Sequence, residues 1–431
     1  MIQKLITVLA ALMLVPLPAT FAQEQSPETS KRPVQTAIRA ARLLDVKSGA
    51  LINNAVVLVE GERIVAVGSG LSIPAGARVI DVGDMTLLPG LIDSHSHLLA
   101  SSVSEYGTML LTKSQAYRAL EGASNARRTL MAGYTAVRDV ESEGAGYADV
   151  ALRDAINRGL VEGPRMKVAT RAIALIGQMQ PLGISPDLPD FPRGAQMISG
   201  VEEARRAVRE QIGNGADLIK IFADWTYPTL TIEEMSVIVE EAHKAGRRVA
   251  AHADTTVGIR NAITAGVDSI EHGFRIDRAS LELMKQKGVS WVPTYGRRLA
   301  SFAALTDEEI RPRATVRMLE LKKMLQTAQE LGVKIAAGWD PGDEQDHGTN
   351  AQEIGLLTTA GITNLEAIRA ATINGAELLG WEDRIGSLET GKLADIIAVS
   401  GNPLTDIKQL EHVSFVMKGG VVIKDEHKVG K

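Results

Sequence analysis

Four of the eight histidines in this chain lie where short apolar runs end. His95 and His97 follow Leu91-Ile92-Asp93, and an extended chain points alternate side chains to the same side. His252 and His272 end two further apolar runs. One such histidine is more often structural, but four imidazoles in equivalent positions predict a metal site. The chain has no cysteine, so nitrogen and oxygen atoms must supply the ligands.

A lysine and an aspartate occupy comparable positions. Lys220 lies inside the apolar run 218–222, and Asp340 closely follows the run that ends at Gly338. Desolvation lowers the pKa of a lysine from its ordinary ~10.4, and the neutral amine can then add carbon dioxide to form a carbamate. A carbamate is an oxygen anion that can bridge two cations. The alternative is a structural lysine in a salt bridge.

Together these side chains predict a site for two divalent metal ions. In the proposed arrangement, one ion is held by His95, His97 and Asp340, the second is held by His252 and His272, and carboxylated Lys220 bridges them. Zn²⁺ suits this set best, with Mn²⁺ or Co²⁺ as alternatives.

Such a centre predicts hydrolysis of an amide bond. Paired ions would bridge a water and bring its pKa towards ~7, and the resulting hydroxide would attack a carbonyl carbon. Asp340 would take the proton and deliver it to the departing nitrogen, acting as a proton shuttle.

Residues 89–382 must form the framework that brings these side chains together. Helical stretches that end in glycine alternate there with short apolar strands, as at Gly133 before 135–139 and at Gly266 before 269–272. Eight such strands predict an α/β fold of the (β/α)8 TIM-barrel type, in which the chemistry lies at the carboxyl ends of the strands. An open doubly wound sheet is the alternative, but no glycine-rich dinucleotide turn follows the first strand.

Both ends of the chain have a different pattern. Residues 34–88 and 383–431 contain short apolar runs separated by turn residues, such as Gly61-Glu62-Arg63. Two sets of strands from opposite ends of a chain can meet if the termini of the intervening barrel are close. The sequence therefore predicts a small composite β-sandwich domain formed by the N- and C-terminal segments.

The first residues have the features of a signal peptide. Lys4 precedes an apolar run from Leu5 to Val15, prolines follow, and cleavage is expected after Ala22, leaving residues 23–33 as a flexible exported N-terminus. A bilayer span needs ~20 apolar residues, so the run is too short to be an anchor. A buried N-terminal helix is the alternative. We expect a periplasmic or secreted protein without a membrane anchor.

The net charge of −5 gives no electrostatic reason to expect nucleic acid as a partner. The expected ligand is instead a small molecule with an amide or peptide bond.

Several motifs resemble those of the metal-dependent amidohydrolase superfamily. They include the run from Leu88 to His97, Glu271-His272-Gly273 and the segment from Gly391 to Asp395. In that family the metal ligands are a histidine pair on the first strand, a carboxylated lysine on the fourth, single histidines on the fifth and sixth, and an aspartate on the eighth. The resemblance places these roles on His95, His97, Lys220, His252, His272 and Asp340.

Within the superfamily the chain is most similar to exported dipeptidases and carboxypeptidase-like members, including Xaa-Pro dipeptidase-like enzymes and bacterial members that hydrolyse ochratoxin A. Gly133–Asp139 and Gly215–Lys220 resemble sequence motifs that are usual in this branch. The resemblance implies release of a C-terminal amino acid from a dipeptide or an N-acyl amino acid, with ochratoxin A giving phenylalanine and ochratoxin alpha as one example. It also implies a homo-oligomer, with an octamer as one expected state.

The released amino acid carries a carboxylate, which a donor or a cation must meet. Tyr227, in the loop after the Lys220 strand, is the first candidate, with rim packing as its alternative. His347 and Gln180 are further candidates, as are Arg297 or Arg298, although most loop arginines are only solvated. Many family members have Gly-His-Gly after the third strand, where this chain has 177–180 Gly-Gln-Met-Gln, so a substrate-contacting histidine is missing.

Two other functions remain open from the sequence. A mononuclear cyclic amidase of the imidazolonepropionase type, or a deaminase, would use one metal and no bridging lysine. The deaminase branch expects an acid three residues after the fifth-strand histidine, where this chain has Thr255. A catalytically dead exported binding barrel is the alternative of a different class, and it would be expected to have lost ligands.

Overall fold

The computed structural model describes residues 35–100, 102, 105–178, 187, 191–225, 229–308 and 310–426. These residues belong to one unit of the chain, Val34–Lys431. The predicted signal peptide 1–22 and the segment 23–33 lie outside the described residues. No described helix combines the length and the apolar character needed to cross a membrane.

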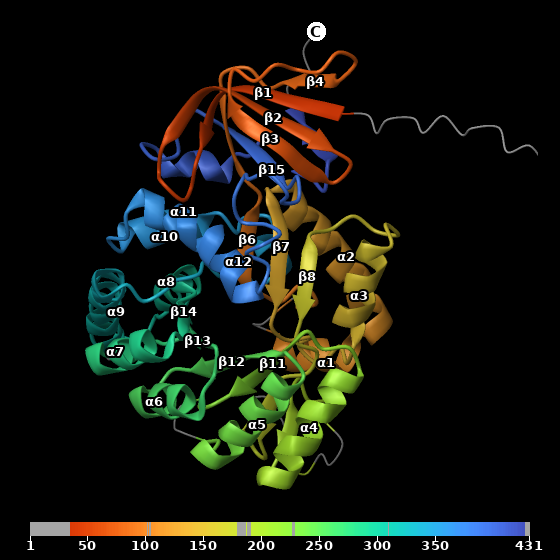
Figure 1. Cartoon of the computed structure of the whole chain (residues 1–431). Coiled ribbons are helices and arrows are strands. Elements are labelled where there is room, and N and C mark those ends of the chain that lie inside the picture. Colours follow the sequence, from red (N-terminus) through yellow and green to blue (C-terminus); the bar gives the residue numbers. More distant parts are fainter. Residues whose placement is uncertain are drawn as a thin grey trace, which may run out of the picture. The chain divides into compact units, whose positions relative to one another are not determined.

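Parallel strands and helices alternate through the middle of the chain, as Figure 1 shows. The barrel strands are β6 (Leu91–Ser96), β7 (Tyr134–Asp139), β8 (Arg165–Val168), β11 (Leu218–Phe222), β12 (Arg248–Ala253), β13 (Ser269–His272) and β14 (Ser290–Val292). An isolated parallel bridge between Trp291 and Ile335 marks the eighth position.

Backbone hydrogen bonds close these strands into a barrel. Strands β6, β7 and β8 form one sheet, and β11 to β14 belong to another. The N–H of Asp217, next to β11, donates to the carbonyl of Val168 in β8 over 2.8 Å. On the other side, the N–H of Ala336 donates to Trp291 over 2.9 Å and Ser94 donates to Ala337 over 2.8 Å. The predicted (β/α)8 barrel is confirmed.

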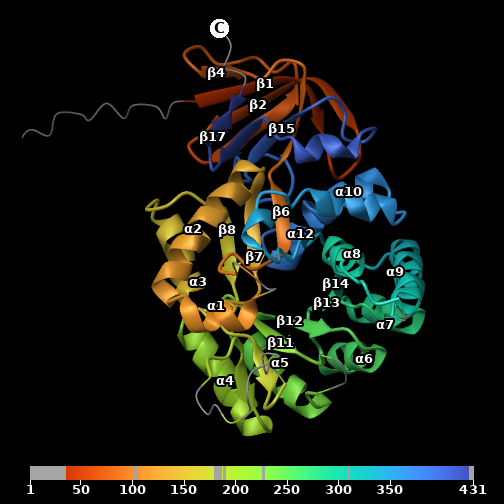
Figure 2. The same cartoon turned by 180° about the vertical axis from the view of Figure 1, so that it is seen from behind.

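Helices cover the outside of the barrel, and their ends are encoded locally. Figures 1 and 2 show α2 and α3 beside β7 and β8. Helix α5 begins with a capping box between Thr231 and Glu234, and α6, α7 and α9 end at glycines in the left-handed conformation, as predicted. The helices are α1 (Tyr106–Thr112), α2 (Gln115–Met131), α3 (Ala148–Asn157), α4 (Val201–Gly213), α5 (Ile232–Lys244), α6 (Thr256–Ala265), α7 (Arg278–Lys287), α8 (Tyr295–Ala303), α9 (Arg311–Leu331), α10 (Gln352–Thr359), α11 (Asn364–Ala370) and α12 (Ile373–Leu379).

Two short strands that the sequence pattern did not predict extend the sheet beyond β11. Strand β9 (Ile173–Leu175) pairs in parallel with β11 through Ile173 and Ile221, and β10 (Gln196–Ile198) pairs with β9. They belong to the long connection that follows β8.

Strands from both ends of the chain form one eight-stranded sheet in the order β17-β16-β15-β5-β1-β2-β3, with β4 on β1. Its strands are β1 (Gln35–Leu44), β2 (Leu51–Glu60), β3 (Arg63–Ser69), β4 (Arg78–Asp81), β5 (Met85–Pro89), β15 (Ile396–Ser400), β16 (Phe415–Lys418) and β17 (Val421–Asp425). Antiparallel pairing of β5 with β15 joins the two ends, and Ile64 of β3 shares an apolar core with Phe415 of β16. The composite β-domain therefore has strands of both ends around one core.

Candidate metal centre

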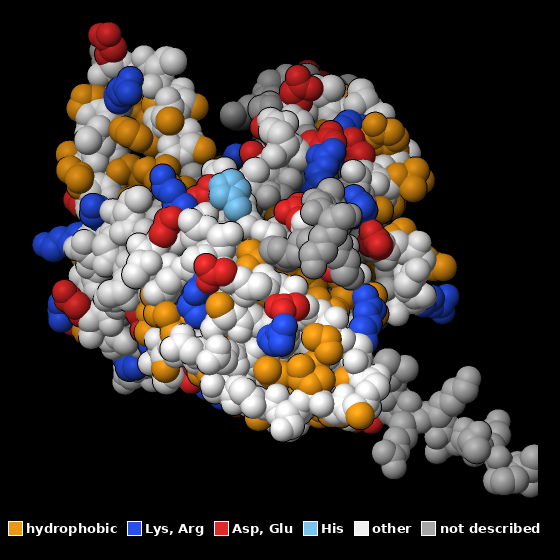
Figure 3. Space-filling model, turned by 90° about the horizontal axis from the view of Figure 1, so that it is seen from above, with side chains coloured by type: hydrophobic (Ala, Val, Ile, Leu, Met, Phe, Trp, Pro, Cys, Tyr) orange, Lys and Arg blue, Asp and Glu red, His pale blue; other side chains and the backbone are white. Residues whose placement is uncertain are grey.

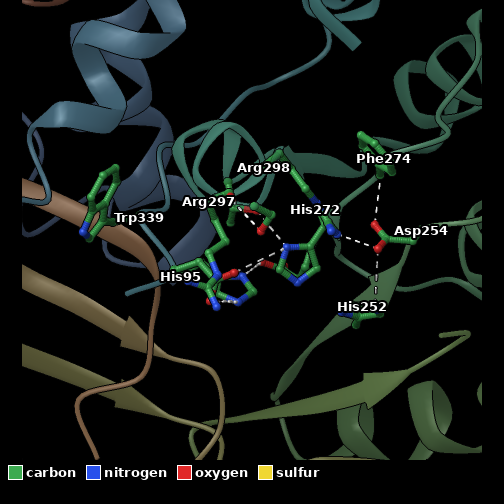
Figure 4. A network of polar contacts seen from close by, with 12 residues as sticks. His95, His252, Asp254, His272, Phe274, Arg297, Arg298 and Trp339 are labelled. Carbon is green, nitrogen blue, oxygen red and sulfur yellow. Dashed lines mark hydrogen bonds and ion pairs between the residues drawn. The ribbon is translucent and has the colours of Figure 1, made fainter. Parts of the chain in front are cut away.

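The four predicted histidine ligands lie together at the carboxyl ends of β6, β12 and β13. The ring centroids of His95 and His97 are 5.2 Å apart, those of His95 and His272 are 4.8 Å apart, and those of His252 and His272 are 4.6 Å apart. All four residues are buried. Figure 4 shows His95, His252 and His272 gathered where the strands end. Histidines that are far apart in the sequence thus form one continuous cluster.

Asp340 lies against this cluster. Its Oδ1 is 3.8 Å from Nε2 of His95 and 3.5 Å from Nε2 of His97, and its Oδ2 is 3.8 Å from Nδ1 of His272. One ligand atom from each of His95, His97 and Asp340 lies within 4.8 Å of the others. These are the three side chains predicted to hold the first ion.

The ring nitrogens that face the centre lack partners. Nε2 of His95 and Nε2 of His252 are buried and have no hydrogen-bond partner in the described part of the chain. Burial lowers the pKa of His95 well below its ordinary value and that of His252 to about 3, so both imidazoles are neutral. A neutral ring with a free nitrogen is the form that binds a metal ion, so these residues fit one.

Lys220 lies in the same buried region and is only 2% exposed. Within the described ranges no carboxylate is close enough to form an ion pair with its ammonium group. Burial lowers its pKa, against the opposing effect of Glu271 and Glu141. The described contacts therefore do not support the alternative of a structural lysine held in a salt bridge. A lysine with this pKa shift is suited to add carbon dioxide.

A buried ion pair that the sequence analysis did not identify orients the first histidine. Nδ1 of His95 lies 2.7 Å from Oε2 of Glu271, and Nη2 of Arg138 lies 2.7 and 2.8 Å from the two carboxylate oxygens of Glu271. Arg138 also donates through Nε to the carbonyl of Ser94 over 2.6 Å. When Nδ1 carries the proton for Glu271, Nε2 is left as a free ligand atom.

The other two histidines near Asp340 also have partners for their remaining nitrogen. Nδ1 of His272 is 2.7 Å from Oγ1 of Thr294, and Nδ1 of His97 is 3.2 Å from Oε1 of Glu143. Thr294 and Glu143 lie in the loops after β14 and β7, and this location in a loop at the carboxyl end of a barrel strand is the one sequence signal that could have identified them.

The backbone at the strand ends is unusual. His272, Thr294 and Asp340 have positive φ angles of 67°, 44° and 54°, which are costly for residues other than glycine and typical of functional sites. Gly338 makes room for the first ligand, because a Cβ there would lie 2.6 Å from Cβ of His95. The positions of these side chains thus depend on the strained turns that follow the strands.

A buried carboxylate ties the first strand to the eighth. Oδ1 of Asp93 accepts the N–H groups of His95 and Trp339, each over 3.1 Å, and its Oδ2 accepts from Asn350 over 2.7 Å. Burial raises the pKa of Asp93 to about 7. The loop that carries Asp340 is therefore fixed relative to His95.

Among the predicted substrate-binding residues, His347 lies within the described part of the chain. Tyr227 and Gln180 lie outside the described residues. His347 is 4% exposed, and neither of its ring nitrogens has a partner among the described residues. Burial lowers its pKa to about 4. Its role in substrate binding stays a prediction.

Comparisons with known proteins match the barrel together with strands of the β-domain. A model of the amidohydrolase family matches residues 86–423. The ochratoxinase of Aspergillus niger is 34% identical, over 89% of this chain and 86% of the ochratoxinase. The crystal structure of A. niger ochratoxinase has a TM-score of 0.81 at 31% identity, covering 91% of this chain and 96% of the solved chain. A crystal structure of a Xaa-Pro dipeptidase with methionine bound in the active site has a TM-score of 0.82 at 35% identity, covering 90% of this chain and 100% of the solved one.

Proposed function

Because this chain belongs to the amidohydrolase family, whose model matches residues 86–423, we propose that it uses two divalent metal ions to release a C-terminal amino acid from a dipeptide or an N-acyl amino acid. Family membership and the relatives make it a metal-dependent hydrolase of amide bonds. Zn²⁺ as the metal, a carbamate on Lys220 and the substrate class belong to the proposal.

The observation that carries the proposal is a pair of buried ring nitrogens without hydrogen-bond partners among the described residues, Nε2 of His95 and Nε2 of His252, one in each predicted ligand set. His95, His97 and Asp340 offer one set of ligands, and His252 and His272 offer a second set across the cluster. Lys220 shares this buried region without a carboxylate partner among the described residues. A single ion would leave buried nitrogen atoms of the other set unsatisfied, which is costly.

Two bound divalent ions would supply a water of lowered pKa and would polarise the scissile carbonyl. Asp340 contributes the proton transfer. Its carboxylate lies within 3.8 Å of nitrogen atoms of His95, His97 and His272 and is 16% exposed on the side chain, so a substrate can reach it. It takes the proton of the attacking water and passes it to the leaving nitrogen.

The substrate class rests on the relatives. One similar structure is a Xaa-Pro dipeptidase and another is an ochratoxinase. A dipeptide and ochratoxin A share an amide bond whose nitrogen belongs to an amino acid with a free carboxylate. We therefore propose that the enzyme recognises this part of the substrate.

The first experiment measures metal content per chain and hydrolysis of N-acetyl-phenylalanine and ochratoxin A. For the wild type we expect about two ions per chain and release of phenylalanine. Lys220→Ala should lose metal and activity together, because the bridging oxygen atoms are absent. A short carboxylic acid such as propionate should restore part of both in Lys220→Ala.

Circular dichroism and thermal unfolding of Lys220→Ala show whether the variant is folded, and Lys244→Ala on the exposed side of α5 is the matched control. One ion per chain with unchanged activity in Lys220→Ala would contradict the binuclear proposal and favour the mononuclear cyclic amidase.

A further inference from the structure

Two consecutive arginines lie near the start of helix α8, which follows β14 and lies next to the candidate metal centre. Arg297 and Arg298 lie in its first turn, and both are partly buried. Figure 4 shows Arg298 reaching toward Asp254, whereas Arg297 lies on the side of His95. Their contacts differ in a way that separates their roles.

Arg298 is already paired. Its Nη2 donates to Oδ2 of Asp254, and its guanidinium lies 5.2 Å from the ring centroid of Phe274. Oδ1 of Asp254 accepts the N–H of Phe274 over 3.2 Å. Arg298 therefore holds together the loops that follow β12 and β13, which carry His252 and His272. Its charge is compensated within the protein.

Arg297 has no such compensation. Its guanidinium makes no hydrogen bond and no ion pair with any residue in the described ranges. It packs closely on Gly342, where a Cβ would lie 2.0 Å from Nη1 and 2.7 Å from Cζ. The absence of a side chain at Gly342 leaves room for the guanidinium group in this position. The uncompensated cation thus lies against the loop that carries Asp340.

The backbone that presents Arg297 is firmly held. The N–H groups of Tyr295 and Gly296 donate to the two carboxylate oxygens of buried Glu353, over 2.9 and 2.7 Å. Thr294, at the start of the same turn, contacts Nδ1 of His272. The position of Arg297 is therefore fixed relative to both predicted ligand sets, which favours recognition of a defined group over random solvation.

We infer that Arg297 binds the carboxylate of the leaving amino acid and so restricts the enzyme to substrates with a free C-terminus. The inference rests on the proposed function. In a dipeptide or an N-acyl amino acid, the carboxylate carbon is two bonds from the scissile nitrogen. Asp340 delivers the proton to that nitrogen, and Arg297 lies against the same loop. A guanidinium presents paired donors that match a carboxylate.

The test compares two ligands that differ only in this group: N-acetyl-phenylalanine and N-acetyl-phenylalaninamide. Their binding to the metal-loaded full chain is measured by calorimetry, and their hydrolysis is measured in parallel. Wild type should bind the carboxylate form about 10- to 100-fold more tightly than the amide form. Arg297→Gln should lose this preference, chiefly by weaker binding of the carboxylate form, and Arg297→Lys should restore part of it.

Two variants serve as controls. Arg298→Gln should weaken the binding of both ligands to the same extent, because Arg298 acts through Asp254 and the loops after β12 and β13. Arg313 lies at the exposed start of α9, so Arg313→Gln should leave the binding of both ligands unchanged. An Arg297→Gln variant that keeps the preference for the carboxylate form, or a wild type without that preference, would overturn the inference.

Binding and hydrolysis separate this inference from the proposed function. A wild type that binds the carboxylate form through Arg297 but releases no amino acid supports the inference and contradicts the hydrolysis. A wild type that hydrolyses both ligands, with Arg297→Gln affecting them equally, contradicts the inference and supports hydrolysis of the amide bond.

Discussion

At the level of single residues, Glu271 decides which nitrogen of His95 is available. Its carboxylate is fully buried, and both of its oxygens accept from Nη2 of Arg138. Burying these two charges requires their desolvation, which is energetically costly. Such partners are typical of sites where a metal-binding histidine must be oriented. Through its contact with Nδ1 of His95, Glu271 is placed to act as a positioning residue for a metal ion at the candidate centre.

We predict that Glu271→Gln lowers metal affinity by about 10- to 100-fold, the usual effect of losing such a partner. The amide keeps the shape of the side chain but removes the charge that holds the proton on Nδ1 of His95. Titration with Zn²⁺ against a competing chelator measures the change, and Glu330→Gln on the exposed face of α9 is the control. Equal affinity of wild type and Glu271→Gln would contradict the role.

The sequence predicted the clustered side chains but not their partners. His95, His252 and His272 could be found because each ends a barrel strand, and barrel geometry brings strand ends together. Arg138 could not be found in this way. It lies 133 residues from Glu271, and their contact depends on which strands face each other across the barrel interior.

At the level of elements, helix α8 depends on an acid from another helix. Glu353 in α10 accepts the first N–H groups of α8, those of Tyr295 and Gly296. No cation pairs with Glu353 among the described residues, and burial raises its pKa to about 8. Between pH 4.5 and about pH 8, Glu353 is therefore protonated in the folded protein and ionised in the unfolded chain.

This contact predicts a pH-dependent contribution to stability. The folded-state pKa of about 8 is above the ordinary 4.5, so the contribution is complete below 4.5 and is lost as the pH rises to 8. The slope is at most about 1.4 kcal/mol per pH unit. Urea unfolding of wild type and Glu353→Gln between pH 5 and pH 8 measures it. As the pH rises, the unfolding free energy of wild type should fall relative to that of Glu353→Gln. A difference between the two proteins that stays constant with pH would contradict the prediction.

Element ends were easier to predict than short or irregular elements. Gly266, Gly288 and Gly332 ended helices as expected, because the left-handed conformation needed there favours glycine. Strands β9 and β10 are three residues each, and their apolar residues do not stand out from the surrounding loop. Pairing of β9 with β11, and of β10 with β9, makes them strands, and such pairing is not visible in one segment alone.

At the level of the whole molecule, the barrel and the β-domain are joined by buried ionic contacts. Nε and Nη2 of Arg165, at the start of β8, donate to the two oxygens of Asp395 over 3.0 and 3.1 Å. Asp395 is 3% exposed and also accepts the N–H of Gly419 over 2.7 Å. Nζ of Lys418 donates to the carbonyl of Gly163. These contacts connect the third barrel strand to the C-terminal strands.

We predict that Asp395→Asn lowers the free energy of unfolding by about 2–4 kcal/mol, because it leaves Arg165 partly buried without its counter-charge. Metal content should stay unchanged, since Asp395 is not part of the metal centre. Thermal and urea unfolding measure the loss. Asp154→Asn removes a surface ion pair with Arg153 and should cost less than about 1 kcal/mol. A loss no larger than that of the control would show that the contact does not hold the two parts together.

The pairing of β5 with β15 also determines the order in which the protein can be completed during synthesis. Leu87 and Leu88 of β5 are fully buried in the finished protein, but their partner strand begins only at Ile396. Until the ribosome has made that segment, the edge of β5 presents unpaired backbone groups and apolar side chains. Strand β6, which carries His95, follows β5 directly. The first predicted metal ligands are therefore attached to a sheet that the nascent chain can finish only near the end of translation.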